Sequence, residues 1–372
     1  MRKNKAIIAL GVFVAILVLV VIAKTASFYP FLFQLIFEKE VKLKQAEPSN
    51  LNILLLGIGG GSHDGPNLTD TIILANIDEG KNKVTLTSIP RDLWVPDIEG
   101  YNKKINEAYA KGELKKKGGG LTLADAVVER VTGQSVDYAV RIDFNGFIRA
   151  VDTLGGLDII VDNTLDDYRY PISGKEDDPC GFSEEDIKEF IATISAEQEI
   201  SDKFSCRYKH LHFDKGDQHL DGEQALEFVR SRHGVNGEGS DFSRSKRQQK
   251  VITAFKDKIF SAQTLVNPGR IISLYDIVKD SIDTNIKQEE FDDFIRLAQK
   301  MREAKITSLV IDTGDQVVKR QGLLDEAPFT KEYNFLSVLI PRVGNGNFSE
   351  IHKFIECQLS GKDCSLTPRV NN

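Results

Sequence analysis

The run NILLLGI at residues 52–58 is continuously apolar after its first residue, which is typical of a strand buried in the centre of a sheet. Two more strand-like runs follow it, TIILANI at 71–77 and KVTLTSI at 83–89. Helix-like and strand-like patterns then alternate at residues 121–131, 138–142, 144–154 and 157–161. This alternation predicts an α/β fold with a mixed central β-sheet sandwiched between α-helices.

The pattern changes after residue 162. Residues 163–212 are acidic in part and contain Cys180 and Cys206, and we interpret them as an excursion at the domain surface that a disulfide closes. The chain then returns to helix-like patterns and one strand-like run, at residues 222–229, 241–260, 271–278, 291–303, 308–311 and 349–359.

The four cysteines fit an exported protein, and none has the CxxC spacing of a metal site. Four cysteines allow three connectivities. The pairing Cys180–Cys206 with Cys357–Cys364 closes the shortest loops and is the one that we expect, while the other two remain open.

The N-terminus carries the signal for the compartment. Arg2, Lys3 and Lys5 precede residues 6–23, which contain no charged side chain. A helix of about eighteen residues spans about 27 Å, close to the thickness of a hydrocarbon core. We therefore predict a cytoplasmic N-terminus at 1–5, a transmembrane signal anchor at 6–23, a membrane-proximal stalk at 24–50 and an extracytoplasmic domain. The alternative is a cleaved signal peptide, because Ala23 and Ala26 are small, but the apolar run is longer than a typical signal core.

Several function classes fit the sequence poorly. The net charge of −7 disfavours a nucleic-acid partner, which would favour a basic domain. The loop GIGGG at 57–61 does not match the dinucleotide pattern GxGxxG, whose third glycine would fall at Ser62. His210 and His212 could share a strand face, and we interpret them as a solvated or hydrogen-bonded pair rather than as a metal site.

An unusual concentration of arginines lies in FVRSRHG at 228–234 and SDFSRSKRQQ at 240–249. Ser240 or Asp241 can cap a helix that begins there. On that helix Arg244, Arg247 and Gln248 are spaced i, i+3 and i+4, so they share one face. Arg230 and Arg232 precede the helix. The candidate ligand-binding residues are therefore Arg230, Arg232, Arg244, Arg247 and Gln248. Guanidinium groups that converge at a helix N-terminus suit a phosphate or pyrophosphate. The alternative is a solvated basic helix with unrelated arginines.

Carboxylates stand at two predicted strand ends. Asp70 lies at the start of the second strand, and Arg91 and Asp92 follow the third. Ligands of α/β sheets bind at such ends, and Mg²⁺ prefers a few carboxylates plus phosphate oxygens. The alternative for Arg91 and Asp92 is a surface ion pair worth about 0–1 kcal/mol.

These segments, taken in order, resemble the LytR-CpsA-Psr family of bacterial envelope proteins. The matching stretches are NILLLGI, LTDTIILANID, SIPRDLWV, DFNGFIRAVDTLGGLDI, QHLDGEQAL and FVRSRHG…SDFSRSKRQQ. The resemblance covers residues 51–262 and implies a catalytic domain there. Residues 263–372 carry no matching stretch, and we expect them to pack on the same domain or to set partner choice. It implies a membrane-anchored phosphotransferase that moves a glycopolymer from an undecaprenyl-pyrophosphate carrier onto a peptidoglycan sugar hydroxyl. Family members hold the prenyl chain in an apolar pocket between sheet and helices, and the pyrophosphate with arginines and usually Mg²⁺.

Carried over to this chain, the resemblance assigns Asp70 and Asp92 to the metal. The attacking hydroxyl also needs a proton acceptor, and either aspartate is a candidate for this general base. It assigns the pyrophosphate clamp and its hydrogen bonds to Arg91, Arg230, Arg232, Arg244, Arg247 and Gln248, with Asp241 orienting the arginines. Replacing Arg244 and Arg247 together is expected to abolish transfer while leaving folding intact.

One departure from the family concerns the metal. In many members an aspartate follows the LLLG of the first strand, where this chain has Ile58. A metal ligand is therefore missing, or Asp64 of the inserted GGGSHDG loop supplies it. Two other functions stay open on the sequence alone: a prenyl-pyrophosphate hydrolase, and a non-catalytic anchor protein that binds lipid or polymer.

Overall fold

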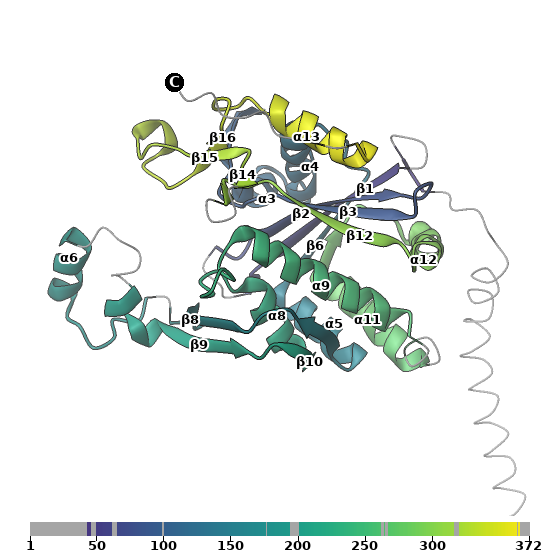
Figure 1. Cartoon of the computed structure of the whole chain (residues 1–372), viewed down its shortest axis with the longest axis horizontal. Coiled ribbons are helices and arrows are strands. Elements are labelled where there is room, and N and C mark those ends of the chain that lie inside the picture. Colours follow the sequence, from purple (N-terminus) through teal and green to yellow (C-terminus); the bar gives the residue numbers. More distant parts are fainter. Residues whose placement is uncertain are drawn as a thin grey trace, which may run out of the picture. The chain divides into compact units, whose positions relative to one another are not determined.

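The computed structural model describes residues 43–45, 50–61, 65–98, 100–175, 177–193, 201–261, 264, 267–315, 320–362 and 364. The chain forms two compact units. One comprises Gln45–Asn285 and Glu303–Asn372, and it holds the central sheet (Figure 1). The other comprises Met1–Lys44 and Ile286–Arg302, and its described part contains the 3-10 turn η3 (Gln288–Glu290) and helix α12 (Phe291–Lys300). The predicted signal anchor at 6–23 lies outside the described residues, and no helix within them is both long and apolar enough to cross a membrane.

The centre of the larger unit is a six-stranded mixed sheet, as predicted. Its order is β11 (Ile282–Thr284), β6 (Tyr138–Asp143), β1 (Asn50–Ile58), β2 (Thr69–Asp78), β3 (Lys83–Ser88) and β12 (Lys305–Val310). The pairs β1–β6 and β3–β12 are parallel, and the other three are antiparallel. The apolar run at 52–58 thus lies inside the sheet, flanked by β2 and β6, which explains why it lacks the alternation of an edge strand.

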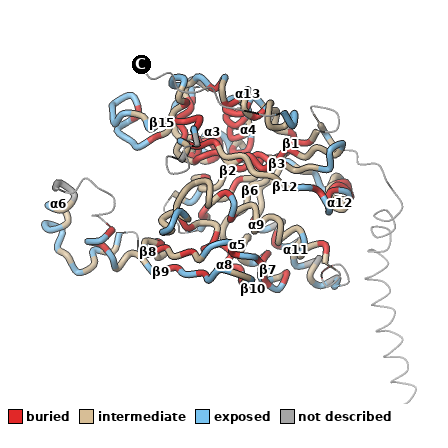
Figure 2. Tube along the Cα trace, viewed as in Figure 1, coloured by how far each residue is buried: buried red, intermediate tan, exposed pale blue. Residues whose placement is uncertain are grey.

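One face of the sheet is covered by helices α3 (Ala108–Lys115), α4 (Gly120–Thr132) and α13 (Ser349–Ser360) (Figure 1). Leu54 and Leu56 of β1 point to this face, where they join the largest apolar core. Val127 and Val131 of α4 lie in the same core and are completely buried. Figure 2 shows buried segments gathered around α4 and the central strands. Apolar residues recur along α4 at helical spacing and form one buried face. Because this face packs on the sheet, the apolar side chains of β1 that contact it must point toward the same layer.

The opposite face carries Ile53 and Leu55 of β1, which contact a smaller apolar cluster with Ile252 of α9 (Asp241–Ile259). Both strand side chains are only half-buried, whereas Leu54 and Leu56 beside them are fully buried. Behind α9 a separate core is built by α5 (Phe144–Leu154), α8 (Gly222–Arg230), β7 (Leu157–Val161) and β10 (Gly216–Leu220). This face of the sheet therefore carries partly covered apolar side chains beside fully buried ones such as Ile73 and Leu86.

The range predicted for the main domain, 51–262, does not include β11 and β12, which lie beyond residue 262 and complete the central sheet. Such pairing joins strands that are far apart in sequence, which local patterns do not report. Helix α11 (Pro268–Ser281) precedes β11. The remaining described elements are β4 (Trp94–Ile98), β5 (Tyr101–Lys104), η1 (Ile105–Glu107), β13 (Gly314–Asp315), β14 (Arg320–Gln321), β15 (Leu324–Glu326), η4 (Lys331–Tyr333) and β16 (Leu339–Pro341).

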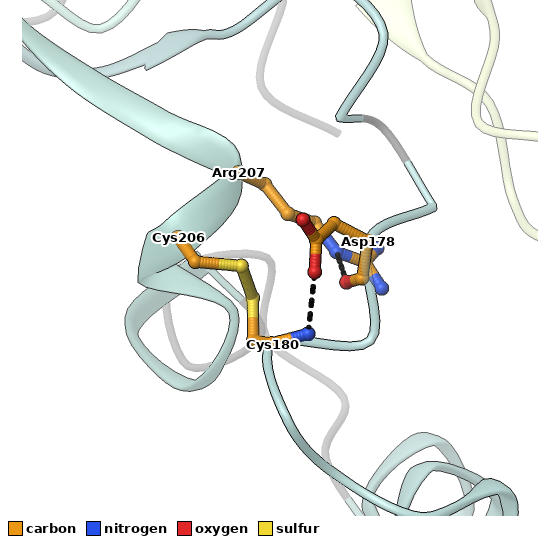
Figure 3. The surroundings of a disulfide bond; sticks show 4 residues. All are labelled: Asp178, Cys180, Cys206 and Arg207. Carbon is orange, nitrogen blue, oxygen red and sulfur yellow. Dashed lines mark hydrogen bonds between the residues drawn. A yellow bond between two sulfur atoms is a disulfide. The ribbon is translucent and has the colours of Figure 1, made fainter.

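The predicted excursion begins and ends in an antiparallel pair, β8 (Leu165–Pro171) and β9 (Tyr208–Phe213). Between them lie α6 (Glu184–Thr193) and the turn η2 (Ser205–Arg207). The expected disulfides Cys180–Cys206 and Cys357–Cys364 are both present. Figure 3 shows the first of them, beside which the backbone carbonyl of Asp178 accepts a hydrogen bond of 2.8 Å from Arg207 Nε.

Replacing Cys180 and Cys206 together with serine is expected to lower the free energy of unfolding by about 3 kcal/mol, from the entropy of the loop that the bond closes. The bonded cysteines are 26 residues apart, against 7 for the Cys357–Cys364 pair. The matched double variant of the second pair should therefore lose about 1 kcal/mol less. Urea unfolding of both variants measures the difference, and equal losses would contradict the loop-length argument.

Candidate functional site

Most of the predicted site residues surround one cavity of about 650 Å³ in the larger unit. It lies where β2 begins and β3 ends, beside the first turns of α9. Members of the predicted set that line it are Asp70, Arg91, Asp92, Arg230, Arg232, Asp241, Arg244 and Gln248. Asp64 lies outside the described residues. The sequence therefore brings four arginines, from a strand end, a helix end and a helix start, into a single concave site.

Helix α9 presents Arg244 and Gln248 to this cavity from its first turns. Ser240 is the N-cap, and its side-chain oxygen accepts a hydrogen bond of 3.1 Å from the backbone N–H of Ser243. Asp241 lies 2.8 Å from Arg244 Nη2 and so orients that guanidinium, the role that the family resemblance implied for it. The helix N-terminus and Arg244 thus face the same space, which favours an anionic ligand.

The electrostatics of Arg244 show how much positive charge converges here. Burial lowers the pKa of Arg244 to about 10; Asp241 opposes this shift, and repulsion from Arg232, Arg91 and Arg247 adds to it. An arginine with this pKa is still protonated at neutral pH. The cluster therefore carries mutual repulsion that a bound phosphate or pyrophosphate would relieve.

Arg230 is the last residue of α8, and its guanidinium carbon lies 4.4 Å from the centre of the Phe144 ring. The same group lies 5.9 Å from the ring centre of Tyr170 in β8. Burial is the main reason that the pKa of Tyr170 is raised to about 12. The aromatic rings hold Arg230 at the cavity without neutralising its charge. Sequence reasoning missed Tyr170, because it lies in the excursion and carries no motif.

Arg247 does not belong to the cavity lining, and its assignment to the pyrophosphate clamp is at odds with the structure. It is 3% exposed, and its Nε donates a hydrogen bond of 2.9 Å to the carbonyl of Phe228. Nη2 donates to the carbonyl of Ser231 at 2.7 Å. Nη1 donates to the carbonyl of Glu238 at 2.8 Å and approaches its carboxylate at 3.1 Å. Arg247 therefore fastens the loop between α8 and α9 and positions the arginines at either end of it.

Arg91 is held between two carboxylates at the cavity edge. Its Nη1 lies 2.5 Å from Asp70 Oδ1, and its Nε lies 3.5 Å from Asp92 Oδ2. The other oxygen of Asp92 lies 2.7 Å from Lys104 Nζ of β5. Burial alone would raise the pKa of Asp92, but Lys104, Arg91 and Arg232 outweigh it, and the pKa lies below its ordinary value. Lys104 was missed by sequence reasoning, since β5 pairs with β4 in a hairpin that the patterns did not indicate.

Of the two carboxylates predicted to bind a divalent metal ion, Asp70 suits that role and Asp92 does not. Asp70 lines the cavity, and Mg²⁺ needs only one or two carboxylates when phosphate oxygens complete its shell. Asp92 fits poorly, because each of its oxygens already faces a cation. Ile58 is 3% exposed and offers no ligand atom. Within the described ranges, no group of three close ligand residues includes Asp70 or Asp92.

The chain after residue 303 also contributes to the cavity. Asp312, Thr313 and Gly314 line it beyond β12, and Ser337 lines it from the segment before β16. Sequence reasoning assigned no site residue to this part of the chain. No local signal marks these residues. The pairing of β12 with β3 brings Asp312 and its neighbours to the site, and the bridge between Leu93 and Leu339 brings the segment that contains Ser337.

The lowered pKa of Asp92 predicts a pH dependence of stability. Its ion pairs stabilise the fold above about pH 4, the range of an unfolded aspartate, and this contribution is lost as the pH falls through the lower folded value. Asp92→Asn should therefore lower the free energy of unfolding at neutral pH, with the difference from wild type shrinking in acid. Urea unfolding at about pH 7 and about pH 3 tests this. Asp257→Asn, at an exposed position of α9, is the control, and a pH-independent difference for Asp92→Asn would contradict the assignment.

Comparison with known proteins places this chain in a family. The sequence profile of the LytR_cpsA_psr family matches residues 34–326. The polyisoprenyl-teichoic acid–peptidoglycan teichoic acid transferase TagU of Bacillus cereus is 29% identical over 257 residues, covering 68% of this chain and 66% of that protein. The corresponding transferase TagV of Bacillus subtilis is 28% identical over 267 residues, covering 70% of this chain and 55% of that protein. The chain thus spans about half to two thirds of the length of these curated relatives.

Solved structures show the same fold. The crystal structure of B. subtilis TagV superposes with a TM-score of 0.53 at 24% identity, covering 84% of this chain and 98% of that one. The structure of TagT bound to LI-WTA gives 0.51 at 21% identity, covering 87% and 96%. The mixed sheet, its helical layers and the profile matched from 34 to 326 agree, and this chain belongs to the LytR_cpsA_psr family.

Proposed function

We propose that this protein is a phosphotransferase of cell-wall assembly. It takes a glycopolymer from an undecaprenyl-pyrophosphate carrier and attaches it to a sugar hydroxyl of peptidoglycan. The relatives TagU and TagV are named as transferases of teichoic acid from a polyisoprenyl carrier to peptidoglycan, which supports the donor and acceptor classes. In this proposal residues 6–23 anchor the chain in the cell membrane, with the N-terminus in the cytoplasm and the catalytic domain outside.

The observation that carries the proposal is the arginine-lined cavity at the edge of the sheet. Arg91, Arg230, Arg232 and Arg244 line it together, and the positive end of the α9 helix dipole lies beside them. A pyrophosphate offers several anionic oxygens that guanidinium forks can bind in pairs. Gln248, one turn beyond Arg244, can donate a further hydrogen bond.

The half-buried face of the sheet supports a lipid donor. A narrow extension of about 20 Å³, lined by Thr71, Ser88 and Val310, shares Arg244 and Gln248 with the main site. Deeper along the same face lie Ile53 and other incompletely buried apolar side chains, namely Leu55, Val84, Ile252 and Ile306. In this proposal the prenyl chain occupies this face while the pyrophosphate stays at the arginines.

The proposed reaction transfers the phosphoryl group that carries the glycan from the bridging oxygen of the pyrophosphate to the acceptor hydroxyl oxygen. The acceptor hydroxyl oxygen forms a bond to the phosphorus that carries the glycan, and the bond from that phosphorus to the bridging oxygen breaks. Undecaprenyl phosphate leaves with the bridging oxygen, and the hydroxyl proton passes to a base. The arginines neutralise charge on the phosphoryl oxygens and the leaving phosphate, which is the main requirement of this chemistry.

Of the two predicted bases, Asp70 suits the role better than Asp92. Lys104 and Arg91 flank Asp92, and the pKa of Asp92 is lowered, which makes it a weak proton acceptor. Asp70 is also the described carboxylate that fits Mg²⁺ beside the donor phosphates. When bound, Mg²⁺ would add charge neutralisation at the pyrophosphate.

The test is an assay of the full-length chain with a prenyl-pyrophosphate-linked oligosaccharide, Mg²⁺ and peptidoglycan fragments. Mass spectrometry follows prenyl phosphate and the glycan–phosphate–saccharide product, with and without the peptidoglycan fragments. We expect release of prenyl phosphate to depend on the acceptor and to equal product formation. Release without acceptor would make the protein a hydrolase, and binding without turnover would make it an anchor protein; either result would contradict the proposal.

A further inference from the structure

A second group of metal-ligand side chains lies on the strand pair β8–β9, apart from the arginine cavity. Asp166 of β8 and His212 of β9 are direct cross-strand partners. His210 precedes His212 by two residues, so its side chain points to the same face of the pair. Leu211 and Phe213 on the alternate face are buried, which fixes the two histidines on the outer side.

The three side chains converge on one point. His210 Nε2 lies 2.8 Å and His212 Nδ1 2.7 Å from the same oxygen of Asp166. All three ligand atoms lie within 4.8 Å of one another. Ligands of a tetrahedral zinc ion lie about 2.0–2.2 Å from the metal and therefore roughly 3.3 Å apart. Opening the group by about half an ångström would thus admit an ion, without moving the strands.

Neighbouring groups fix the orientation of both rings. His212 Nε2 lies 3.2 Å from Asp214 Oδ1, so the nitrogen that faces away from Asp166 has its own carboxylate. Metal-binding histidines usually donate their second ring N–H to such an acceptor. The ring of His210 stacks on Tyr168, with ring centres 4.1 Å apart and an angle of 7°. Both rings are thus held with a nitrogen toward Asp166.

We infer that Asp166, His210 and His212 form a binding site for a divalent transition-metal ion, for which Zn²⁺ is the best match. Two imidazoles and a carboxylate suit zinc, whereas Mg²⁺ prefers oxygen ligands alone. Both histidines are exposed, so water can complete the coordination. Both histidines are hydrogen-bonded to Asp166, as one of the two interpretations from the sequence expected. The proposed metal site goes beyond that interpretation, because its third ligand comes from a distant strand that the sequence spacing did not indicate.

Metal binding by Asp166, His210 and His212 would also affect the arginine cavity, because β8 is hydrogen-bonded to the loop that carries Arg232. The backbone carbonyl of Asp166 accepts a hydrogen bond of 2.9 Å from Val235 N. On the inner face, Asp167 accepts hydrogen bonds from Ser231 Oγ at 2.7 Å and from His233 N at 3.2 Å. These bonds hold the loop that carries Arg232. An ion that ties β8 to β9 should therefore stabilise this loop as well as the strand pair.

Calorimetric titration of the full-length chain with Zn²⁺ tests the site, with an expression tag that contains no histidine. We expect one ion per chain and a higher unfolding temperature on binding. Asp166→Asn, His210→Ala and His212→Ala should each weaken Zn²⁺ binding by about 100-fold or more, and Asp214→Asn by about 10- to 100-fold.

His219→Ala is the matched control, because His219 is exposed and pairs with the single carboxylate of Asp158 at 2.6 Å. It should bind Zn²⁺ as the wild type does. Circular dichroism without metal shows whether each variant is folded. The inference is overturned if the wild type binds no Zn²⁺, or if the Asp166, His210 and His212 variants bind it as tightly as the wild type. This outcome is independent of whether the protein transfers glycopolymers.

Discussion

Arg244→Ala is expected to lower the rate of glycopolymer transfer by about 10³-fold or more, since one arginine at a transferring phosphoryl group contributes on this scale. Arg244 stands at the N-terminus of α9 among Arg91 and Arg232, where its guanidinium can bind two phosphate oxygens. Arg244→Lys keeps the charge and loses the planar fork, so it should recover part of the rate. Initial rates of prenyl phosphate release measure all three proteins.

The same substitution should not unfold the protein. It removes a group repelled by neighbouring arginines, and Asp241 remains at the helix N-terminus, where negative charge is favourable. The unfolding midpoint of Arg244→Ala should equal or exceed that of the wild type. Lys246→Ala is the control, since Lys246 is an exposed cation of the same helix that does not line the cavity. Equal transfer rates for Arg244→Ala and Lys246→Ala would contradict the role given to Arg244.

Arg247→Ala is expected to lower the free energy of unfolding by about 3–5 kcal/mol, because it leaves buried hydrogen-bond acceptors and a buried carboxylate without their charged partner. The carbonyls of Phe228 and Ser231 would lose their donors, and Glu238 would lose its ion pair. Urea or thermal unfolding measures the loss. This expectation replaces the earlier one that Arg247 could be removed without affecting the fold, and any loss of transfer would follow from displacement of Arg230 and Arg232.

Two further variants separate this effect from a general sensitivity of α9. Lys250→Ala removes a partly exposed cation that pairs with Asp162 at 2.8 Å, and should cost only about 0–1 kcal/mol. Glu238→Gln keeps the carbonyl partner of Arg247 but removes the carboxylate charge, and should have an intermediate effect. If Arg247→Ala unfolds at the same urea concentration as Lys250→Ala, Arg247 does not fasten the loop.

Local sequence patterns predicted the elements near the site well. The apolar run at 52–58 is a central strand, and the i, i+4 spacing of Arg244 and Gln248 places both at the cavity. The same spacing argument failed for Arg247. A helical repeat shows which residues lie near one face, but it does not show which backbone carbonyls of a neighbouring helix end lie opposite each residue.

The features that the sequence did not indicate all depend on contacts between distant segments. Lys104 reaches Asp92 from β5, Tyr170 reaches Arg230 from β8, and Ser337 joins the cavity from the C-terminal part. Short loops between cysteines made the disulfide pairing predictable, because loop closure is least costly there. The pairing of β3 with β12 has no such local signal, so the sequence did not show that the strand at 305–310 joins the central sheet.

The most direct test of the central claim is the affinity of the wild-type chain for a short-chain prenyl pyrophosphate, measured by calorimetry beside the Arg244→Ala variant. If the cavity holds the pyrophosphate, the wild type should bind the ligand, inorganic pyrophosphate should compete, and Arg244→Ala should weaken binding by at least about tenfold, the loss of one charge-assisted contact. The wild type should also bind prenyl pyrophosphate more tightly than prenyl alcohol. Equal affinity of the wild type and Arg244→Ala for prenyl pyrophosphate would show that the arginine cavity is not the site of this ligand.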